Sequence, residues 1–320
     1  MDTARQLKKV CPTPFIFRAG VWKPRTNPDT FQGAGEEALE WLHEVQHKLG
    51  LPVATEVALP EHVDAALQAG IDYLWIGART SANPIAVQTL CEQLMVHTHR
   101  PKAVLIKNPV NADAALWLGN IERLERAGVQ VMAVHRGCNH APCWFMAHAV
   151  RTARPDIPLL LDPSHMSGDA AQIAPLLDKA ATLDYNGAMI EVHVHPEEAL
   201  SDSGQQITPL QLHNTLNSIV SRKCLASLIS ASEEVNELSW LRAEIDELDD
   251  RLWDTIAARM EVSKRIGEWK KAHGVAPLQP ERYQQILTQR CQWATKSGMD
   301  AAFVEEILQA IHTQSLKQQE

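Results

Sequence analysis

The sequence has few cysteines and no long apolar run, and these two absences exclude several classes of protein. Its six cysteines are dispersed over 320 residues, without the density of a disulfide-rich secreted domain or the spacing of a zinc site. No stretch approaches the roughly 20 apolar residues of a membrane span. The first residues, MDTARQLKKV, also lack the apolar core of a secretory signal. We therefore expect a cytoplasmic protein without a membrane partner.

The chain also lacks an excess of positive charge and a glycine-rich phosphate loop. Its formal net charge of −9 argues against a nucleic-acid partner. Nothing matches the GxGxxG pattern of a Rossmann dinucleotide site. The length is enough for about two domains, and 22% charged and 45% hydrophobic residues are typical of a globular protein.

Short apolar segments alternate with longer amphipathic ones over the first 221 residues, a pattern typical of a parallel α/β fold. Strands are expected at 13–19, 51–57, 72–77, 102–107, 129–134, 157–162 and 187–193. Helices are expected at 2–10, 34–49, 61–69, 84–98, 111–127, 142–153, 169–182 and 208–221. Helices therefore outnumber strands by one.

Polar residues stand at the carboxyl end of nearly every expected strand. They are Arg18, Glu56, Arg79, Lys107, Arg136, His165 and Glu191. A doubly wound sheet would concentrate such residues at one switch point, whereas a (β/α)8 barrel brings all strand ends to one face. The sequence therefore predicts a (β/α)8-type TIM barrel that lacks its first strand, followed by an all-α domain.

Six of the residues after these strands are cations that together predict an anion pocket. Arg18, Lys23 and Arg25 crowd one loop, FRAGVWKPRT, and repel one another unless an anion lies between them. Arg79, Lys107 and Arg136 follow later strands. Single residues of this kind are more often solvated surface charges. Six at equivalent strand ends favour a phosphorylated or carboxylated ligand.

A second set of residues predicts a divalent metal site. His165 ends the string LLLDPSH. In AMIEVHVH the strand period places Glu191, His193 and His195 on one face, and Asp202 follows in ALSD. One histidine and two carboxylates suit an ion of the Mn, Fe, Co or Zn class, so we assign His165, Glu191 and Asp202 as ligands. His195 is interpreted as an ordinary strand-face residue. Such a metal would act as a Lewis acid on a carbonyl.

The last part of the chain is predicted to be helical. Residues 239–273 keep one helical apolar period, and helices at 280–296 and 300–318 follow. The first of these is about 50 Å long and cannot bury its apolar side alone, which indicates a homodimer. The expected domains are 1–222, a linker at 223–237, and 238–320.

Three cations on the long helix form a further candidate site. Arg259 and Lys270 are 11 residues apart and share a helix face. Arg242 lies 28 residues before Lys270, roughly 42 Å along the axis, so the two cannot hold one small ligand within one chain. An antiparallel partner helix would bring them together. The alternative is that these are ordinary solvated charges.

The strings KPRTxxxxFQG, GARTxxN, LIKNP, HRG, DPSH and EVH…ALSD resemble the type I DAHP synthases over about residues 1–221. The resemblance implies a metal-dependent condensation of phosphoenolpyruvate with erythrose 4-phosphate. It places Arg18, Lys23, Arg79, Lys107 and Arg136 at the phosphoenolpyruvate site, with Lys23 and Lys107 as catalytic residues. It places Arg25, Thr26 and Ser164 on the erythrose 4-phosphate side.

The chain departs from that family in two places. It has no GPCS string, which carries the fourth metal ligand on the first strand, and Cys11 is at the wrong end of its helix to replace it. The segment 137–162 is also about ten residues shorter than we expect for relatives, in which a loop of this segment normally helps to cover the site. We expect that Met1 is an internal methionine or that the chain is a fragment, and that metal affinity is weakened.

The segment LRAEIDELDDRLWDTIAARMEVSKRIGEWK…LQPERY…IHTQSLKQQ resembles the all-helical chorismate mutases over about residues 235–320. The resemblance implies rearrangement of chorismate to prephenate without a cofactor. The implied site residues are Arg242, Arg259, Lys270, Arg282, Ser315 and Gln319, with Arg259 and Lys270 as catalytic cations. Lys270 would stabilise the charge on the breaking ether oxygen. Gln279 and Tyr283 stand where many relatives carry acidic residues.

Three functions remain open at this point. The leading one is a bifunctional enzyme of aromatic amino acid biosynthesis with both activities. The second is a chorismate mutase whose incomplete barrel is a regulatory or scaffold module. The third is a related enzyme that condenses phosphoenolpyruvate with a sugar to an eight-carbon acid.

Overall fold

The computed structural model describes residues 1–11, 13–23, 29–139, 141–226, 233–276 and 278–319. They form two compact units, Met1–Glu244 and Ile245–Glu320, each of which is described by itself. No helix within the described ranges combines the length and the apolar character that crossing a membrane demands.

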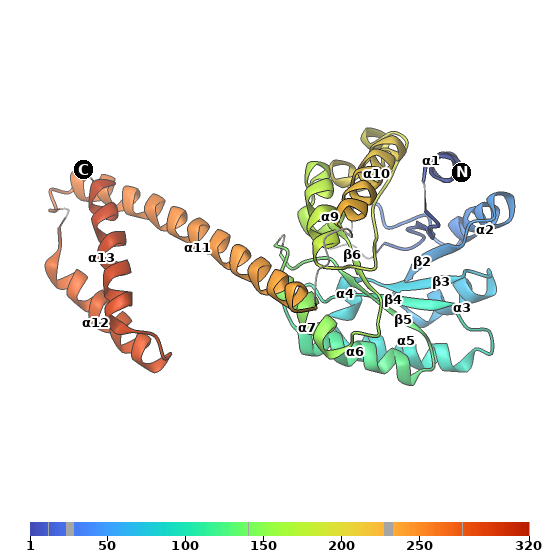
Figure 1. The fold of residues 1–320 in the computed structure, drawn as a ribbon, viewed down its shortest axis with the longest axis horizontal. Helices are drawn as coiled ribbons and strands as arrows, with labels where there is room; N and C mark the ends of the chain where they lie inside the picture. Colours follow the sequence, from blue (N-terminus) through green and yellow to red (C-terminus); the bar gives the residue numbers. More distant parts are fainter. Residues whose placement is uncertain (12, 24–28, 140, 227–232, 277, 320) are drawn as a thin grey trace. The chain divides into compact units, whose positions relative to one another are not determined.

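The first unit is built on a parallel sheet of seven strands (Figure 1). The strands are β1 (Phe17–Ala19), β2 (Val53–Val57), β3 (Tyr73–Ile76), β4 (Ala103–Lys107), β5 (Val131–His135), β6 (Leu159–Leu161) and β7 (Gly187–Ala188). Each strand pairs with the next one along the chain, and within the described residues β1 and β7 are the open edges. The predicted barrel without its first strand is therefore confirmed as a curled, open α/β half-barrel.

Helices separate consecutive strands and cover the outer face of the sheet. In the first unit they are α1 (Asp2–Val10), α2 (Glu37–Leu49), α3 (Pro60–Gln68), α4 (Ala78–Ser81), α5 (Pro84–Val96), α6 (Ala114–Arg126), α7 (Trp144–Ala153), α8 (Pro163–Ser167), α9 (Ile173–Thr182) and α10 (Pro209–Ala226). Side-chain caps fix several of their starts. Asn83 accepts hydrogen bonds from the N–H groups of Ile85 and Ala86, and Asp113 accepts one from Leu116.

The strands β2 to β6 are mostly buried, which explains their apolar character, whereas the edge strands β1 and β7 are not. On β4 all five residues are buried. Alternate positions face the outer helices and join the main core, while Trp75, Leu105 and Val134 form a second cluster on the inner side of the curled sheet. Charged side chains of these strands lie instead at or after their carboxyl ends.

Several boundaries differ from those expected, and β1 begins at Phe17 instead of residue 13. Strand β7 spans only Gly187–Ala188 instead of 187–193, because beyond it the chain leaves the sheet edge and pairs once with a later loop, at Val192 and Ile207. The expected linker 223–237 is partly helical, since α10 continues to Ala226 and the next helix begins at Glu233. Residues 227–232 lie outside the described part.

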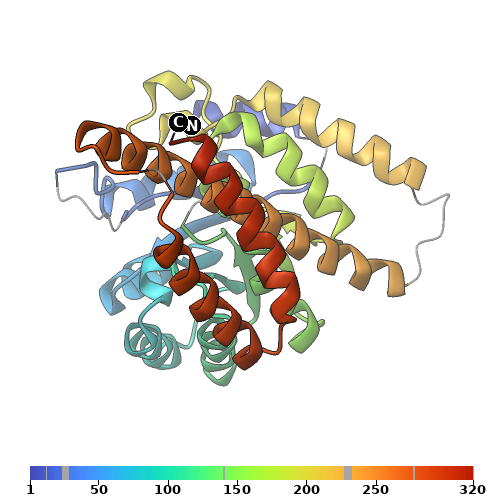
Figure 2. The same ribbon diagram turned by 90° about the vertical axis from the view of Figure 1, so that its left-hand side faces the viewer.

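The remaining helices are α11 (Glu233–Ala272), α12 (Pro280–Lys296) and α13 (Ala301–Lys317). The boundary between the two units falls within α11, after Glu244. In the second unit α12 and α13 lie side by side (Figure 2). Asp300 caps α13 by accepting a hydrogen bond from the N–H of Ala302.

Candidate functional site

A polar pocket lies at the carboxyl ends of the strands in the first unit, with a volume of about 100 Å³. Five of the predicted cations line it, namely Arg18, Lys23, Arg79, Lys107 and Arg136. The pocket is also lined by the three predicted metal ligands, His165, Glu191 and Asp202. The parallel strands therefore bring residues from β1 to the loops after β7 to one rim. Arg25 and Thr26 lie outside the described residues.

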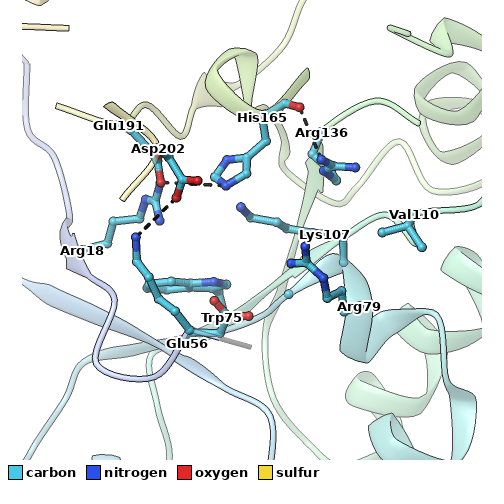
Figure 3. Close-up of a pocket in the computed structure, with 13 residues that line it drawn as sticks. Arg18, Glu56, Trp75, Arg79, Lys107, Val110, Arg136, His165, Glu191 and Asp202 are labelled. Carbon is cyan, nitrogen blue, oxygen red and sulfur yellow. Dashed lines mark hydrogen bonds and ion pairs between the residues drawn. The ribbon is translucent and has the colours of Figure 1, made fainter. Parts of the chain in front are cut away.

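The cations occupy two sides of the pocket. Figure 3 shows Arg79 and Arg136 on one side and Arg18 on the other, with Lys107 extending between them. Burial lowers the pKa of Arg136, and the positive charge of Arg79 lowers it further, against the opposing charge of Asp162. Two guanidinium groups on one side of the pocket provide a place for an anion with several oxygens.

Lys107 is held by a buried carboxylate. Its ammonium lies 2.7 Å from Oδ2 of Asp162, which also receives the backbone N–H of His165 at Oδ1, at 3.1 Å. Burial opposes ionisation of Asp162, but the charges of His165 and Lys107 outweigh it and hold its pKa well below the usual value. The carboxylate therefore stays ionised and fixes the position of the lysine.

On the opposite side, cations pair with the predicted metal ligands. Arg18 donates a hydrogen bond to Oε1 of Glu191 at 3.2 Å, and its guanidinium lies 5.2 Å from the centre of the Trp75 ring. Lys23 donates to the Ser201 hydroxyl at 2.6 Å and lies 3.7 Å from Asp202. Burial raises the pKa of Glu191, but Arg18 and His165 outweigh that effect and lower it.

The metal prediction is met only in part by the geometry. Nε2 of His165 lies 3.8 Å from Oε1 of Glu191, somewhat wider than the roughly 3.4 Å between two tetrahedral ligands about 2.1 Å from one ion. Among the described residues, however, no three His, Cys, Asp or Glu side chains form a group that could hold a metal. His165 and Glu191 are thus close enough together to bind one divalent ion. Asp202 pairs with Lys23 and does not complete the predicted set of three ligands. The His195 side chain is largely exposed and lies beyond the end of β7, so its interpretation as a strand-face residue is wrong.

The prediction that Glu191, His193 and His195 share a strand face is wrong. The strand ends at Ala188, and the His193 ring turns back to its own loop, where its Nδ1 lies 2.7 Å from the His195 carbonyl oxygen. Side chains alternate between two faces only where the strand is paired in a sheet, so the alternating pattern does not predict side-chain direction after Ala188.

Several residues of the pocket had no role assigned from the sequence, among them Glu56 and Trp75. Burial raises the pKa of Glu56, and the charges of Lys107 and Arg18 only partly oppose this. Gly77 makes room for that carboxylate, since a Cβ atom there would lie 2.1 Å from its Oε1. The position of Glu56 at the carboxyl end of β2 was a usable signal, because every other polar strand end carried a role.

Asn108 and Ser164 support the pocket from behind. The Asn108 side chain accepts a hydrogen bond from the Arg136 backbone N–H at 2.7 Å and donates one to the Gly137 carbonyl at 3.0 Å. Ser164, predicted to bind substrate, is fully buried, and its hydroxyl accepts a hydrogen bond from the backbone N–H of Glu191 at 3.1 Å. Both residues fix the backbone that carries pocket side chains.

The second unit brings four of the predicted mutase residues together. Lys270 donates a hydrogen bond to Oε1 of Gln319 at 3.1 Å, and Arg259 donates one to the Ser315 hydroxyl. Gly267 allows the end of the chain to approach α11, because a Cβ atom there would meet Cα of Gln319 at 2.6 Å. The C-terminal residues are thus packed against the helix that carries both cations.

Arg282 and Arg242 are placed differently. Arg282 is exposed and reaches Gln285 on its own helix at 3.4 Å. Arg242 is exposed and belongs to the first unit. Tyr283 stacks on His312 with ring centres 4.1 Å apart. Burial lowers the pKa of His312, and the charges of Arg259 and Lys270 lower it further, which places this pair beside the two cations.

The first unit is thus a parallel α/β half-barrel with a cationic pocket at the carboxyl ends of its strands, the architecture of the α/β-barrel class. The chain belongs to the DAHP synthetase I family, whose model matches residues 1–224. Residues 241–320 match a second model, chorismate mutase type II. The resemblance of both parts is confirmed, and the match of both models does not favour a barrel that serves only as a scaffold.

Individual relatives agree with the two models. A phospho-2-dehydro-3-deoxyheptonate aldolase of Thermotoga maritima is 31% identical over 199 residues, which are 60% of this chain and 56% of that protein. This chain therefore spans little more than half of that relative's length. A DAHP synthase structure from the same organism has 28% identity and a TM-score of 0.60, covering 71% of this chain and 65% of that one. A 4-amino-4-deoxychorismate mutase of Streptomyces venezuelae is 37% identical over 81 residues, 25% of this chain and 79% of that protein.

Proposed function

We propose that the chain is bifunctional, condensing phosphoenolpyruvate with erythrose 4-phosphate in its first unit and converting chorismate to prephenate through its helical unit. The observation that carries the first activity is the meeting of five cations in one pocket with a buried carboxylate that fixes Lys107. Arg79 and Arg136 accommodate the phosphate of phosphoenolpyruvate, and Lys107 with Arg18 and Lys23 neutralises its carboxylate.

In the proposed reaction, carbon 3 of phosphoenolpyruvate forms a bond to the aldehyde carbon of erythrose 4-phosphate. Water adds at carbon 2, and inorganic phosphate leaves. The cations hold the enol ester in place and stabilise the charge that moves along it. His165 and Glu191 would hold a divalent ion of the Mn, Fe, Co or Zn class, with Asp202 as third ligand once it separates from Lys23; when bound, the ion supplies Lewis-acid polarisation of the aldehyde.

Phosphate release from the two substrates tests this activity. The full chain with Mn²⁺ should form inorganic phosphate only when both substrates are present. Arg136→Ala should lower kcat/KM by about a hundredfold or more. Arg126→Ala is the matched control, because Arg126 is an exposed helix residue paired only to Glu122 among the described contacts. Equal rates for Arg136→Ala and wild type would contradict the proposal.

An eight-carbon product is the competing possibility for the first unit. A 2-dehydro-3-deoxyphosphooctonate aldolase of Thioalkalivibrio sulfidiphilus is 28% identical over 260 residues, covering 72% of this chain and 86% of that protein. Such a product would need a five-carbon sugar phosphate in place of erythrose 4-phosphate. The same phosphate-release assay with the two sugars decides between them.

For the helical unit, the pair of cations Arg259 and Lys270 beside Ser315 and Gln319 supports binding of a dicarboxylate. The rearrangement is pericyclic, so it needs no nucleophile or cofactor. Lys270→Ala should reduce chorismate consumption by about a hundredfold or more. Lys271→Ala, at the exposed neighbouring position, should leave it unchanged.

A second candidate substrate follows from the Streptomyces relative, which is a 4-amino-4-deoxychorismate mutase. The charges acting on His312 are those of Arg259 and Lys270, both positive. A substrate ammonium group near the Tyr283–His312 pair would be repelled, whereas a hydroxyl group would not. We therefore favour chorismate, and a comparison of kcat/KM for the two substrates tests this choice.

We further propose that the helical unit acts as a homodimer in the cytoplasm. Apolar residues of α11 that keep one helical period are exposed in the single chain, among them Leu248, Leu252, Val262 and Ile266. An antiparallel second copy would cover them and would bring its Arg242 to the Arg259 and Lys270 of this chain.

A further inference from the structure

The first turns of α11 carry a side chain that neither family match includes. Trp240 lies between the two matched regions, which end at residue 224 and begin at residue 241. Its side chain is nevertheless 2% exposed and belongs to the main core of the half-barrel. Ala243, one turn further, is fully buried. This part of the helix is therefore packed like a barrel element.

The residues around Trp240 come from α7 and from the loop before β7. Its ring stacks on His148 with centres 5.6 Å apart and planes 6° apart, and it contacts Trp144 at 6.5 Å and Tyr185 at 5.6 Å. The Glu244 carboxylate, one turn beyond Trp240, lies 2.6 Å from Nδ1 of His148. Since His148 and Trp144 are one turn apart on α7, two adjacent helical turns interlock there.

This cluster continues to the end of β5, the strand that Arg136 directly follows. The Tyr185 hydroxyl lies 2.8 Å from Nδ1 of His135, and the His135 ring also packs against Trp144 at 5.7 Å. His135 is the last residue of β5, and Arg136 follows it directly. The ring of His135 is fully buried among these aromatic side chains, while Arg136 lines the pocket.

We propose that Trp240 is a positioning residue for Arg136: the start of α11 locks Tyr185 and Trp144 around His135, and so sets where the Arg136 guanidinium lies. This inference rests on the proposed anion pocket. The indole N–H of Trp240 has no hydrogen-bond partner among the described residues, so its packing, rather than a hydrogen bond, fixes the cluster. An aromatic ring without the N–H therefore retains the effect.

The test compares Trp240→Ala and Trp240→Phe with Trp253→Ala in the full chain. Trp253 is the control, because it stands on the same helix and is 65% exposed. Binding of phosphoenolpyruvate is measured by calorimetry, together with KM for both substrates. Trp240→Ala should raise the Kd and the KM for phosphoenolpyruvate about tenfold, the size of one weakened charge-assisted contact, with KM for erythrose 4-phosphate unchanged. Trp240→Phe should return both to within about twofold of wild type.

A readout without substrate separates this inference from the proposed function. Cys138 is buried two residues after Arg136, and Asn108, which holds the Arg136 backbone, contacts its sulfur at 3.5 Å. Alkylation of each cysteine by iodoacetamide, resolved by peptide mass spectrometry, should increase at Cys138 about tenfold in Trp240→Ala but not at buried Cys91 on α5.

The outcomes are distinct. If wild type does not bind phosphoenolpyruvate but Cys138 alone becomes reactive in Trp240→Ala, the proposed function fails and the positioning role stands. If Cys138 and Cys91 become reactive together, or if Trp240→Ala binds phosphoenolpyruvate as wild type does, Trp240 only stabilises the fold and the inference is overturned.

Discussion

The Lys107 ammonium lies 2.7 Å from Oδ2 of Asp162, and the two side chains are 6% and 0% exposed. Removing one partner of such a buried pair leaves the other charge without compensation, which costs about 3–5 kcal/mol. We predict that Lys107→Met lowers the free energy of unfolding by about 3 kcal/mol and raises the pKa of Asp162. The double variant with Asp162→Asn should lose less than the sum of the single losses, because it leaves no buried charge. Urea unfolding of the four proteins measures this, and strict additivity would contradict it.

The contact between Gly77 and Glu56 gives a second prediction. A Cβ atom at Gly77 would lie 2.1 Å from Oε1 of Glu56, so Gly77→Ala must displace that buried carboxylate from the pocket wall. We expect kcat/KM of the condensation to fall about tenfold or more. Adding Glu56→Asp, which shortens the side chain, should recover part of the loss.

The control for this experiment is Gly119→Ala. A Cβ atom at Gly119 meets only the flexible end of Arg123, at 3.3 Å, so that substitution should leave activity unchanged. Loss of activity without recovery in the Glu56→Asp background would show that Gly77 matters for another reason.

The cations of the pocket could be predicted because a parallel sheet places strand ends together. Arg18, Arg79, Lys107 and Arg136 needed only the positions of their strands, and the structure brings them to one rim. The strand period failed at His193, because the chain leaves the sheet at Ala188 and no ladder fixes side-chain direction beyond it. A sequence pattern holds only as far as the element that produces it.

Trp240 and Asn108 could not be assigned from the sequence for a different reason. Trp240 sits in a helical period that reads as the beginning of the mutase helix, yet it packs on α7 and Tyr185. Asn108 acts on the backbone of Arg136, 28 residues away. Such contacts depend on tertiary proximity between segments, which hydrophobic periodicity does not encode.

The buried ring of His135 predicts a pH dependence of stability. Burial lowers the pKa of His135 from 6.5 to about 3. Between these two pH values the unfolded chain binds a proton at His135 that the folded chain does not bind. The contribution of His135 to the free energy of unfolding is therefore fully present above pH 6.5 and is lost as the pH falls. The loss should be roughly 2 kcal/mol between pH 6.5 and pH 5.

Unfolding of wild type and His135→Asn across this pH range measures that contribution. Asparagine has no proton to gain, so the slope of the variant should be shallower, whatever its stability at neutral pH. Asp162 and Glu191 titrate below their usual carboxylate range and affect both proteins equally. Parallel slopes would assign the pH dependence to other groups.

Metal binding should depend on His165 and Glu191 and not on His195. We predict that Mn²⁺ raises the Tm of wild type, since an ion at about a hundredfold its Kd stabilises the folded state by about 2.7 kcal/mol. His165→Ala and Glu191→Gln should abolish the shift, and a chelator should reverse it. His195→Ala is the control, because the His195 side chain is 62% exposed. An equal loss in all three variants would place the ion elsewhere.

Arg242 and Lys270 lie at opposite parts of one helix, which makes the proposed dimer testable by complementation. Arg242→Ala and Lys270→Ala should each be nearly inactive in chorismate turnover, because each dimer site takes Arg242 from one chain and Lys270 from the other. After unfolding and refolding an equal mixture, half of the dimers contain one chain of each kind, and one of their two sites has both residues. About a quarter of wild-type activity should therefore return. Refolding each variant alone is the control, since neither can form an intact site. If the mixture remains as inactive as its components, each site is built within one chain and the antiparallel pairing is wrong.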